Sequence, residues 1–296
     1  MYLNETLKVL NERASLRNYS EREIEPEVMD MLMQTACNSP SGGNIQPFSI
    51  IKIQDKDMGV KLGEMCWQPF IGKAPLNLLY CLDLNRNAIL AEHDGVPYTA
   101  NHAFRHFWIS FQDTIISAQS VCVAADSMGL GSCYIGTIME FFEKCIEMFQ
   151  LPKFVIPVVL ISIGYPESKP NQRKKFTQDV IVHDEKYHQY DPSELSAAYA
   201  NRENGKQIAM NEKNTEMFHA VCQAVHGKEY ADEVLEKTKA RGFFSPIQNL
   251  YGLHYHAAMM PMGNLGFLKI LQNQGIDFFE DWRPLDDTVF DFGEDE

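Results

Sequence analysis

Two arginines and a serine lie within five residues of one another near the N-terminus, in Arg13-Ala14-Ser15-Leu16-Arg17. The planar donor fork of arginine suits phosphate oxygens, and a serine hydroxyl adds a short neutral donor. An isolated R-x-S-x-R also describes the solvated end of a surface helix. These residues alone leave an anion site and a helix end both open.

A second polar segment is SPSGGNIQP, over residues 39–47. Its glycines allow close approach of the backbone, and Ser39, Ser41, Asn44 and Gln46 offer donors and acceptors in several directions. This mixture could line the polar edge of a heterocycle. The same composition is typical of a turn between a helix and a strand.

Two further segments contain glycines or cations. GLGSCYIG (129–136) lacks the G-x-G-x-x-G spacing of a dinucleotide site and the pattern of a P-loop, and capping of a helix end explains its first glycines. Lys169, Arg173, Lys174 and Lys175 form a basic cluster that is either a solvated loop or an anion site.

Composition excludes several classes of function. The chain has 296 residues and a formal net charge of -14, which argues against a nucleic-acid footprint and against attraction to anionic lipid. No apolar run approaches the roughly 20 residues that span a bilayer, and the N-terminal residues lack the layout of a signal peptide. The seven cysteines form no C-x-x-C pair. We therefore expect a cytoplasmic protein that contacts neither membrane nor nucleic acid.

Helical and strand patterns alternate up to about residue 190. A helix is expected from Pro26, and strands over 48–53, 76–82 and 155–163. The apolar pattern of 106–128 predicts a helix buried in the core that stops at Gly129.

The character of the chain changes near residue 191. Residues 193–240 are polar and helix-prone, and 241–271 are rich in aromatics and methionine. We expect a domain over 1–190 and a helical extension over 191–296 that packs on it. The extension ends in an acidic tail with eight acids and one arginine over 280–296.

Together, these segments resemble the nitroreductase family of flavin enzymes, in matching order and spacing. The matching sequences are RASLRNYS, SPSGGNIQPFSI, GLGSCYIG, and PVVLISIGYPESKPNQRKK followed by Val182-His183 and Tyr187. The resemblance covers about residues 10–190. It implies an α+β fold, a mixed sheet wrapped by helices, built as an intertwined homodimer with FMN at the interface.

The resemblance also implies a role for each segment. Arg13, Ala14, Ser15 and Arg17 would contact the phosphate and pyrimidine side of FMN, and Arg173 and Lys175 would complete the phosphate clamp. Ser39, Pro40, Ser41, Asn44 and Gln46 would approach the isoalloxazine, some of them from the partner chain. Tyr134, Ile135 and Gly136 would place backbone groups near the reactive N5 edge.

The implied activity is transfer of hydride from NADH or NADPH through FMN to a small electrophile such as a nitroaromatic or quinone. A fixed cation such as Arg17 favours the reduced flavin, and the cofactor performs the redox chemistry. We therefore name no catalytic residue of the protein. Two alternatives stay open: a specialised relative, such as a reductive dehalogenase or natural-product dehydrogenase, and a non-catalytic flavin-binding protein.

Other residues have two interpretations. Trp67, Gln68 and Phe70 could line the substrate face, although we favour a place in the core. Tyr251, Tyr255 and the methionines of the extension could form a lid, although we favour helix packing for them. The histidines and Cys222 of the extension match no standard zinc module, so no metal site is expected.

Overall fold

The computed structural model describes residues 1–278 and divides the chain into two compact units. The first unit contains residues 1–172 and the segment from Lys269 onward, and the second contains residues 173–268. The acidic tail of 280–296 lies outside the described residues.

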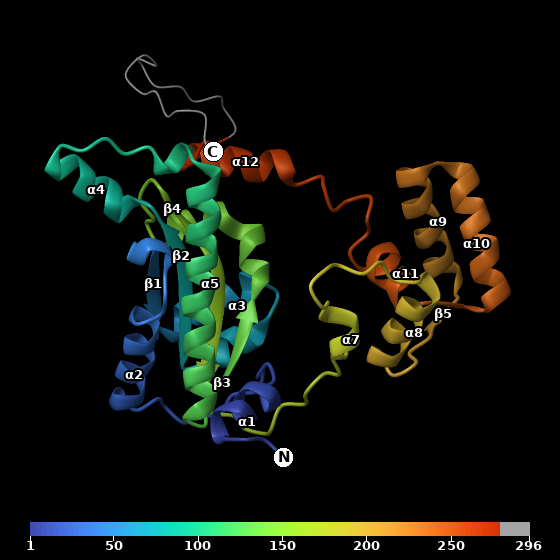
Figure 1. Ribbon diagram of the computed structural model, residues 1–296, viewed down its shortest axis with the longest axis horizontal. Helices are drawn as coiled ribbons and strands as arrows, with labels where there is room; N and C mark the ends of the chain where they lie inside the picture. The colour runs from blue at the N-terminus through green and yellow to red at the C-terminus, as the bar shows by residue number, and fades with distance from the viewer. Residues whose placement is uncertain (279–296) are drawn as a thin grey trace, which may run out of the picture. The chain divides into compact units, whose positions relative to one another are not determined.

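The first unit is built on a four-stranded sheet with the order β1-β2-β4-β3 (Figure 1). The strands are β1 (Phe48–Ile53), β2 (Leu76–Asp83), β3 (Gly131–Ile135) and β4 (Val155–Gly164). All three pairs are antiparallel, with Phe48 opposite Leu82, Leu76 opposite Ile163 and Gly131 opposite Gly164. The three predicted strands are confirmed. The sequence does not predict β3, because it is short and starts at a glycine that also suits a helix cap.

Helices and short 3₁₀ turns surround this sheet. The helices are α1 (Glu5–Glu12), α2 (Pro26–Cys37), α3 (Lys56–Met65), α4 (Asn85–Asp94), α5 (Phe104–Ser127) and α6 (Phe142–Met148). The 3₁₀ turns are η1 (Gly42–Asn44), η2 (Pro69–Lys73), η3 (Ala100–His102) and η4 (Gly136–Phe141). The α+β class is thus confirmed.

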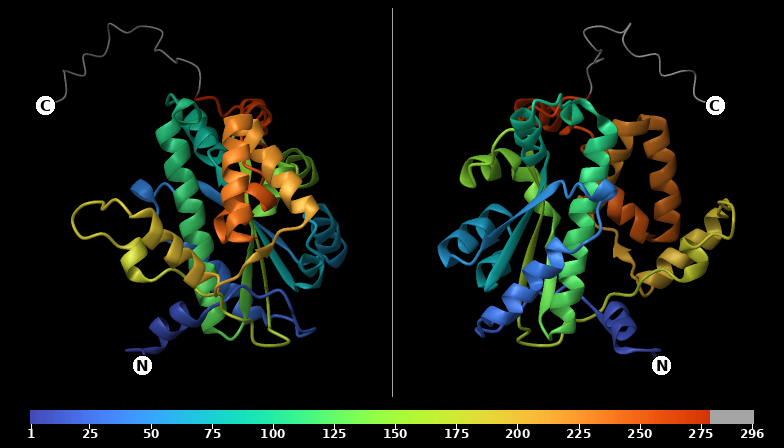
Figure 2. Two further views of the ribbon diagram at one scale, coloured as in Figure 1. Left: turned by 90° about the vertical axis from the view of Figure 1, so that its right-hand side faces the viewer. Right: turned by 60° about the vertical axis from the view of Figure 1, so that its left-hand side comes forward.

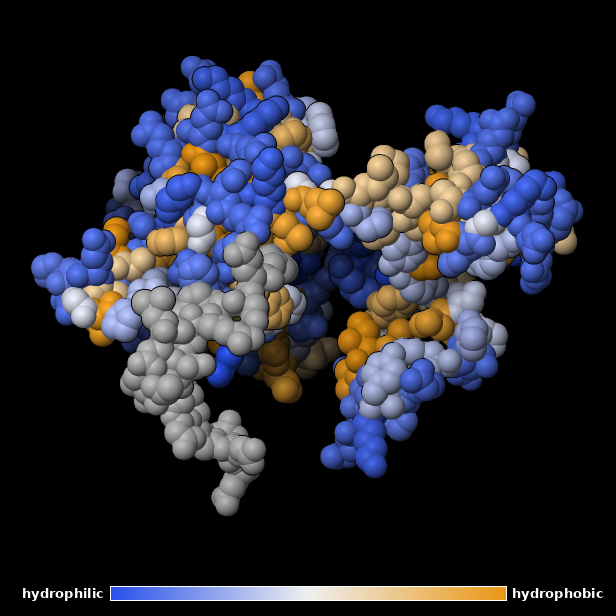
Figure 3. Space-filling view, turned by 90° about the horizontal axis from the view of Figure 1, so that it is seen from above, coloured by the Kyte–Doolittle hydropathy of each residue, from blue (hydrophilic) through white to orange (hydrophobic). Residues whose placement is uncertain are grey.

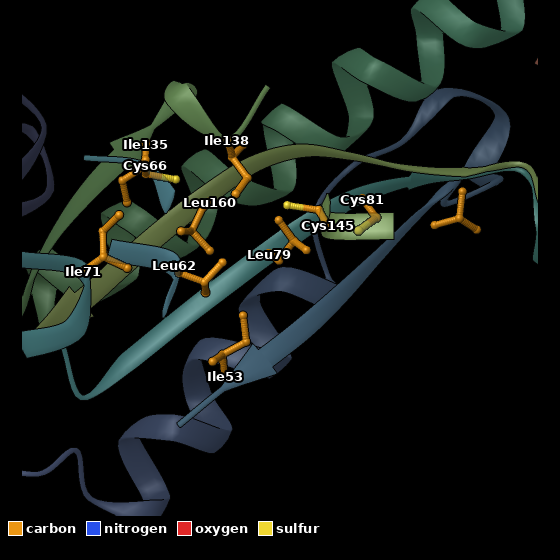
Figure 4. Close-up of a cluster of buried hydrophobic side chains, with 11 residues drawn as sticks. Ile53, Leu62, Cys66, Ile71, Leu79, Cys81, Ile135, Ile138, Cys145 and Leu160 are labelled. Atoms are coloured by element: carbon orange, nitrogen blue, oxygen red, sulfur yellow. The ribbon is translucent and has the colours of Figure 1, made fainter. Parts of the chain in front are cut away.

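The central strands are buried on both faces. Every residue of β2 and β4 is buried, which explains their continuous apolar sequences. One face packs on a cluster that includes Leu62 of α3, Ile71 of η2 and Cys145 of α6 (Figure 4). The long helix α5 lies along the other face and packs against α2 (Figures 1 and 2). The Ser117 hydroxyl of α5 donates to the Ala36 carbonyl of α2 at 3.0 Å.

Helix α5 corrects one expectation. It ends before Gly129, whose φ of 80° suits the cap as predicted. The helix is not buried all round, however, because Phe104, Trp108 and Ile116 are exposed. These residues are spaced four or eight apart, so they share one face of the helix. The apolar composition of α5 therefore reflects a buried face and an apolar exposed stripe.

The second unit is mainly helical. Its elements are α7 (Gln178–Ile181), α8 (Pro192–Arg202), β5 (Ile208–Ala209), α9 (Glu212–His226), α10 (Lys228–Arg241), β6 (Phe243–Phe244), α11 (Pro246–Gln248) and the π-helical turn η5 (Asn249–His254). Helices α9 and α10 pack together, and Phe218, Ala231 and Phe244 are buried in a small core. Apolar residues also remain exposed among hydrophilic ones (Figure 3).

Helix α12 (Asn264–Asn273) leads from the second unit back to the first. The Phe154 N–H donates to the Gln274 carbonyl at 2.7 Å, and the Gln274 side chain donates to the Val155 carbonyl at 2.8 Å. Asn101 Nδ2 donates to the Gly275 carbonyl at 2.9 Å. The residues after α12 are therefore fixed to the start of β4 and to η3. Within residues 1–278, no helix is long and apolar enough to cross a membrane.

Candidate functional site

The N-terminal arginine segment lies against strand β3. The Leu16 N–H donates to the Ser132 carbonyl at 3.0 Å. A Cβ added at Gly131 would lie 2.7 Å from Leu16 Cδ2, so only glycine allows this approach. The structure thus brings together two segments that lie more than 100 residues apart in sequence.

Arg13 is held in an ion pair. Its Nε lies 3.0 Å from Asp126 Oδ2, and its Nη2 donates to the Ser132 hydroxyl at 3.1 Å. The two charged side chains are 20% and 13% exposed. Burial raises the pKa of Asp126, and the hydrogen bond from Arg13 opposes this rise. Arg13 therefore fastens its segment to the end of α5, and its predicted phosphate contact would have to share the guanidinium with Asp126.

A pocket of about 220 Å³ lies beside this ion pair. Its lining includes Arg13, Ala14 and Lys169, together with the acids Glu5 and Asp126. Lys169 belongs to the basic cluster found in the sequence, but the sequence does not predict it as a cofactor ligand. The fold of the first unit places it here because β4 ends beside β3.

Ser15 and Arg17 are exposed at the same edge of the sheet. The guanidinium carbon of Arg17 lies 5.9 Å from the centre of the Phe70 ring. Burial raises the pKa of the Cys133 thiol in β3, and the charge of Arg17 and a hydrogen bond from Ser15 oppose that rise. Arg17 is thus a cation exposed beside β3, with no ion-pair partner among residues 1–278.

The 39–47 loop precedes β1 and has an unusual backbone. Gly43, Asn44 and Gln46 have φ values of 59°, 56° and 50°, in the left-handed region. Such a conformation is uncommon for residues other than glycine, so contacts around the loop must hold it.

Most of the predicted polar side chains in this loop bond to nearby groups of the chain. Ser39 Oγ donates to the Thr35 carbonyl at 3.1 Å, and Ser41 Oγ accepts from the Gln46 N–H at 3.1 Å. Gln46 Nε2 donates to the Cys37 carbonyl at 2.8 Å. Pro40 and Asn44 are exposed, and Asn44 is the member of the set best placed to meet a ligand.

Two residues from helices hold the loop in place. The buried carboxylate of Asp113, in α5, accepts from the Gly42 N–H at 3.0 and 3.2 Å. Arg86, in α4, donates to the Gln46 carbonyl and to the Phe48 carbonyl, the latter at 3.0 Å. The sequence does not predict a role for Asp113, Asp126 or Arg86. An acid on the apolar pattern of 106–128 is the one feature that could have indicated the first two.

The third predicted set lies where β3 ends. The Tyr134 hydroxyl donates to Gln119 Oε1 at 3.3 Å, and Ile135 is buried. Gly136 is exposed at the start of η4, and a Cβ added there would find nothing within 4 Å. The backbone at Gly136 therefore faces open space that a flat ring could occupy.

Trp67 corrects a second expectation. It is 74% exposed, so a core position is wrong for this residue. Its ring packs edge-on against Phe141 of η4, with centres 5.1 Å apart. Gln68 Nε2 donates to Thr137 Oγ1 at 2.9 Å, which ties this turn to η4 directly after Gly136. Phe70 is partly buried and packs against the core cluster, as expected.

The structure places the predicted residues in two groups at opposite edges of the sheet. The 39–47 loop leads into edge strand β1, whereas the arginine segment and Gly136 adjoin edge strand β3. Three strand spacings separate these edges, roughly 14 Å. Along α5, Asp113 and Asp126 are 13 residues apart, or roughly 20 Å.

Arg173 and Lys175 belong to the second unit and are exposed. Lys174, between them, donates to Asn201 Oδ1 at 2.6 Å. In the extension, His219 Nε2 lies 2.7 Å from Asp232 Oδ1, and the His226 ring packs against Tyr230. Among the residues that the structure describes, no three His, Cys, Asp or Glu side chains gather as a metal site would require.

The fold is an α+β sheet covered by helices. At one edge of this sheet lie exposed cations and Gly136, whose backbone has open space beside it. The sequence profile described as the nitroreductase family matches residues 10–165. The chain belongs to the nitroreductase family.

Individual relatives extend this result. The chain is 28% identical over 246 residues to a Bacillus subtilis protein named FMN reductase [NAD(P)H]. This match covers 81% of this chain and 98% of the relative. It is 25% identical to the oxygen-insensitive NADPH nitroreductase of Salmonella typhimurium over 66% of this chain and 79% of the relative. The solved structure of Bacillus megaterium NfrA2 superposes with a TM-score of 0.72 at 25% identity, covering 94% of this chain and 100% of that one. The likeness therefore reaches well beyond residue 190, into the extension.

Proposed function

We propose that this chain is an FMN-dependent oxidoreductase that takes hydride from NADH or NADPH and reduces a small electrophile such as a nitroaromatic or a quinone. The observation that carries the proposal is the meeting of the arginine segment with the start of β3, in a chain that matches an FMN reductase over nearly that enzyme's whole length. When bound, FMN supplies the redox chemistry by accepting a hydride and passing electrons on.

The residues of the first unit fit this cofactor. Among residues 1–278 no carboxylate pairs with the Arg17 guanidinium, and Ser15 adds a neutral donor beside it. A permanent cation suits both a phosphate and the pyrimidine carbonyl, where negative charge gathers on reduction. The open backbone at Gly136 leaves room for the isoalloxazine next to Tyr134 and Ile135. Arg173 and Lys175, which the family resemblance implies for the phosphate clamp, belong to the second unit.

We also propose that the working form is an intertwined homodimer. The two groups of predicted flavin contacts lie at opposite edges of the sheet in one chain, so a partner's 39–47 loop would bring Ser41 and Asn44 to the flavin held beside β3. The exposed apolar stripe of α5, formed by Phe104, Trp108 and Ile116, supports such an interface.

The electron acceptor would meet the exposed Trp67 beside Gly136. An aromatic ring that is 74% exposed and already packed on Phe141 offers a flat apolar surface for another ring. The Gln68–Thr137 hydrogen bond holds this surface next to the end of β3. No acid or base of the protein is needed for the electron transfer itself.

We assign the protein to the cytoplasm. The seven free cysteines support this assignment, because a reducing compartment keeps thiols unpaired.

The direct test of the cofactor is the purified full-length chain. We expect a yellow protein that releases FMN on denaturation, close to one molecule per chain. The Arg17→Ala variant should bind FMN at least about tenfold more weakly, since a charge-assisted contact contributes about 1.5–3 kcal/mol. A colourless wild-type protein that takes up no added FMN would contradict the proposal.

A further inference from the structure

The 39–47 loop is held at two points by groups from distant parts of the chain. At its start, the Gly42 N–H donates to both carboxylate oxygens of Asp113. At its end, the Arg86 guanidinium bridges the Gln46 and Phe48 carbonyls. Between these anchors lie the three residues with left-handed backbone and the exposed Asn44 side chain.

The first anchor, Asp113, lowers the stability of the fold. Asp113 is buried, with only 4% of the residue exposed. Among residues 1–278, Gly42 supplies the hydrogen-bond donor to it. A buried carboxylate with one N–H partner is poorly compensated for the loss of water. Stability alone therefore does not account for an acid at this position.

The second anchor is a single nitrogen of Arg86. Its Nη2 donates to the Gln46 carbonyl and to the Phe48 carbonyl, which lie two residues apart in the chain. Arg86 is itself placed by Asp83, whose Oδ1 accepts from the Arg86 N–H at 3.2 Å and from the Asn85 N–H at 2.9 Å. Both anchors thus extend from helices onto the loop, Asp113 from the interior of α5 and Arg86 from the first turn of α4.

Close packing supports the same arrangement. A Cβ added at Gly42 would lie 2.8 Å from Ile109 Cγ2, so the loop approaches α5 as closely as a glycine permits. The loop is therefore shaped by α5 and α4, and its own sequence supplies the residues that tolerate that shape.

We propose that Asp113 and Arg86 are positioning residues that hold the 39–47 loop in the shape that receives the flavin. This inference rests on the proposed function. A loop fixed before binding loses less conformational freedom when the ligand arrives, so the anchors increase affinity without touching the ligand.

The test measures loop order and FMN affinity separately in the full chain. Amide hydrogen exchange over 39–47 is measured without FMN, and FMN affinity by quenching of flavin fluorescence. In Asp113→Ala, we expect exchange over 39–47 to become about tenfold faster and FMN to bind about tenfold more weakly. The unfolding midpoint should not fall, because the poorly compensated buried carboxylate is removed and water can bond to the N–H of the exposed Gly42.

Two further variants sharpen the result. Asp113→Asn keeps an oxygen that can accept from Gly42, and should lie within about threefold of the wild type in both measurements. Arg86→Ala alters an exposed residue, so it should fold normally and still loosen the loop. Asp30→Ala, at an exposed position of α2, is the matched control and should change neither quantity.

The outcomes distinguish the two proposals. Unchanged exchange in both Asp113→Ala and Arg86→Ala would overturn the anchoring role, whatever FMN does. Faster exchange with unchanged FMN affinity would also overturn it, because the loop would then lie outside the flavin site. Failure of the wild type to bind FMN would instead contradict the proposed function, while the exchange measurement would still test the anchors.

Discussion

At the scale of single residues, the buried acid of α5 makes the stability of the protein depend on pH. Burial raises the pKa of Asp113, and the Gly42 N–H opposes this rise. The folded chain therefore binds a proton at Asp113 more tightly than the unfolded chain does. Below the ordinary aspartate pKa of about 3.9 the acid costs nothing, and as pH rises through the folded pKa stability is lost.

We accordingly expect Asp113→Asn to unfold at a higher urea concentration than the wild type near neutral pH. The gap should narrow as the pH falls through the folded pKa and close at about pH 3, below the ordinary aspartate pKa, where Asp113 is protonated in both states. Urea unfolding of both proteins at the two pH values provides the measurement. A variant less stable than the wild type at neutral pH would show that the carboxylate contributes favourably to the fold.

Trp67 gives a second residue-scale prediction. Because its ring is exposed and the proposed acceptor surface includes it, Trp67→Ala should raise KM for aromatic acceptors several-fold. The affinity for FMN and the rate of reduction by NADPH should stay close to wild type. Equal losses for aromatic and non-aromatic acceptors would contradict a role in stacking.

At the scale of elements, the junction between the arginine segment and β3 is the most sensitive point. Gly131→Ala would place a methyl group 2.7 Å from Leu16 Cδ2 and must push the two apart. We expect a loss of about 1–3 kcal/mol in unfolding free energy, together with weaker FMN binding, since Ser15 and Arg17 flank Leu16. Thermal or urea unfolding and FMN titration would measure the two effects.

Gly266→Ala is the control for this substitution. Gly266 lies in α12, and a Cβ there meets nothing within 4 Å. Alanine is the better helix former, so this variant should be as stable as the wild type or gain up to about 1 kcal/mol. A Gly131→Ala protein as stable as this control would indicate that Leu16 moves aside at little cost.

The sequence predicts elements and segments better than their contacts. Strands β1, β2 and β4 follow from apolar runs with turn residues on either side, and α5 follows from its apolar pattern. Strand β3 and the anchors Asp113 and Arg86 do not. β3 exists because β4 pairs with it, and the anchors act on backbone groups more than 35 residues away. Local sequence does not encode such tertiary contacts.

Trp67 and Arg13 were singled out in the sequence, but their surroundings could not be predicted from it. An isolated tryptophan is usually expected in a core, yet Trp67 is exposed and has a left-handed backbone with a φ of 54°. The R-x-S-x-R segment gives no indication that Asp126 engages its first arginine. The partners of such residues depend on the fold.

At the scale of the whole molecule, the proposed homodimer predicts complementation between two defective chains. If each flavin contacts Arg17 of one chain and Asn44 of the other, a mixed dimer of Arg17→Ala and Asn44→Ala has one intact site and one doubly altered site. Random exchange at equal amounts should restore about a quarter of wild-type activity. Sedimentation would confirm the dimer, and a mixture no more active than its parents would contradict the shared site.

The proposed activity requires electrons to pass from a nicotinamide through bound FMN to an acceptor. The most direct measurement is the visible absorbance of the FMN-loaded protein under anaerobic conditions, with NADPH or NADH added and then a quinone or nitroaromatic acceptor. We predict that the nicotinamide bleaches the flavin band rapidly and that the acceptor restores it. A bound flavin whose band stays unchanged with both nicotinamides would contradict an oxidoreductase and favour a non-catalytic flavin-binding protein.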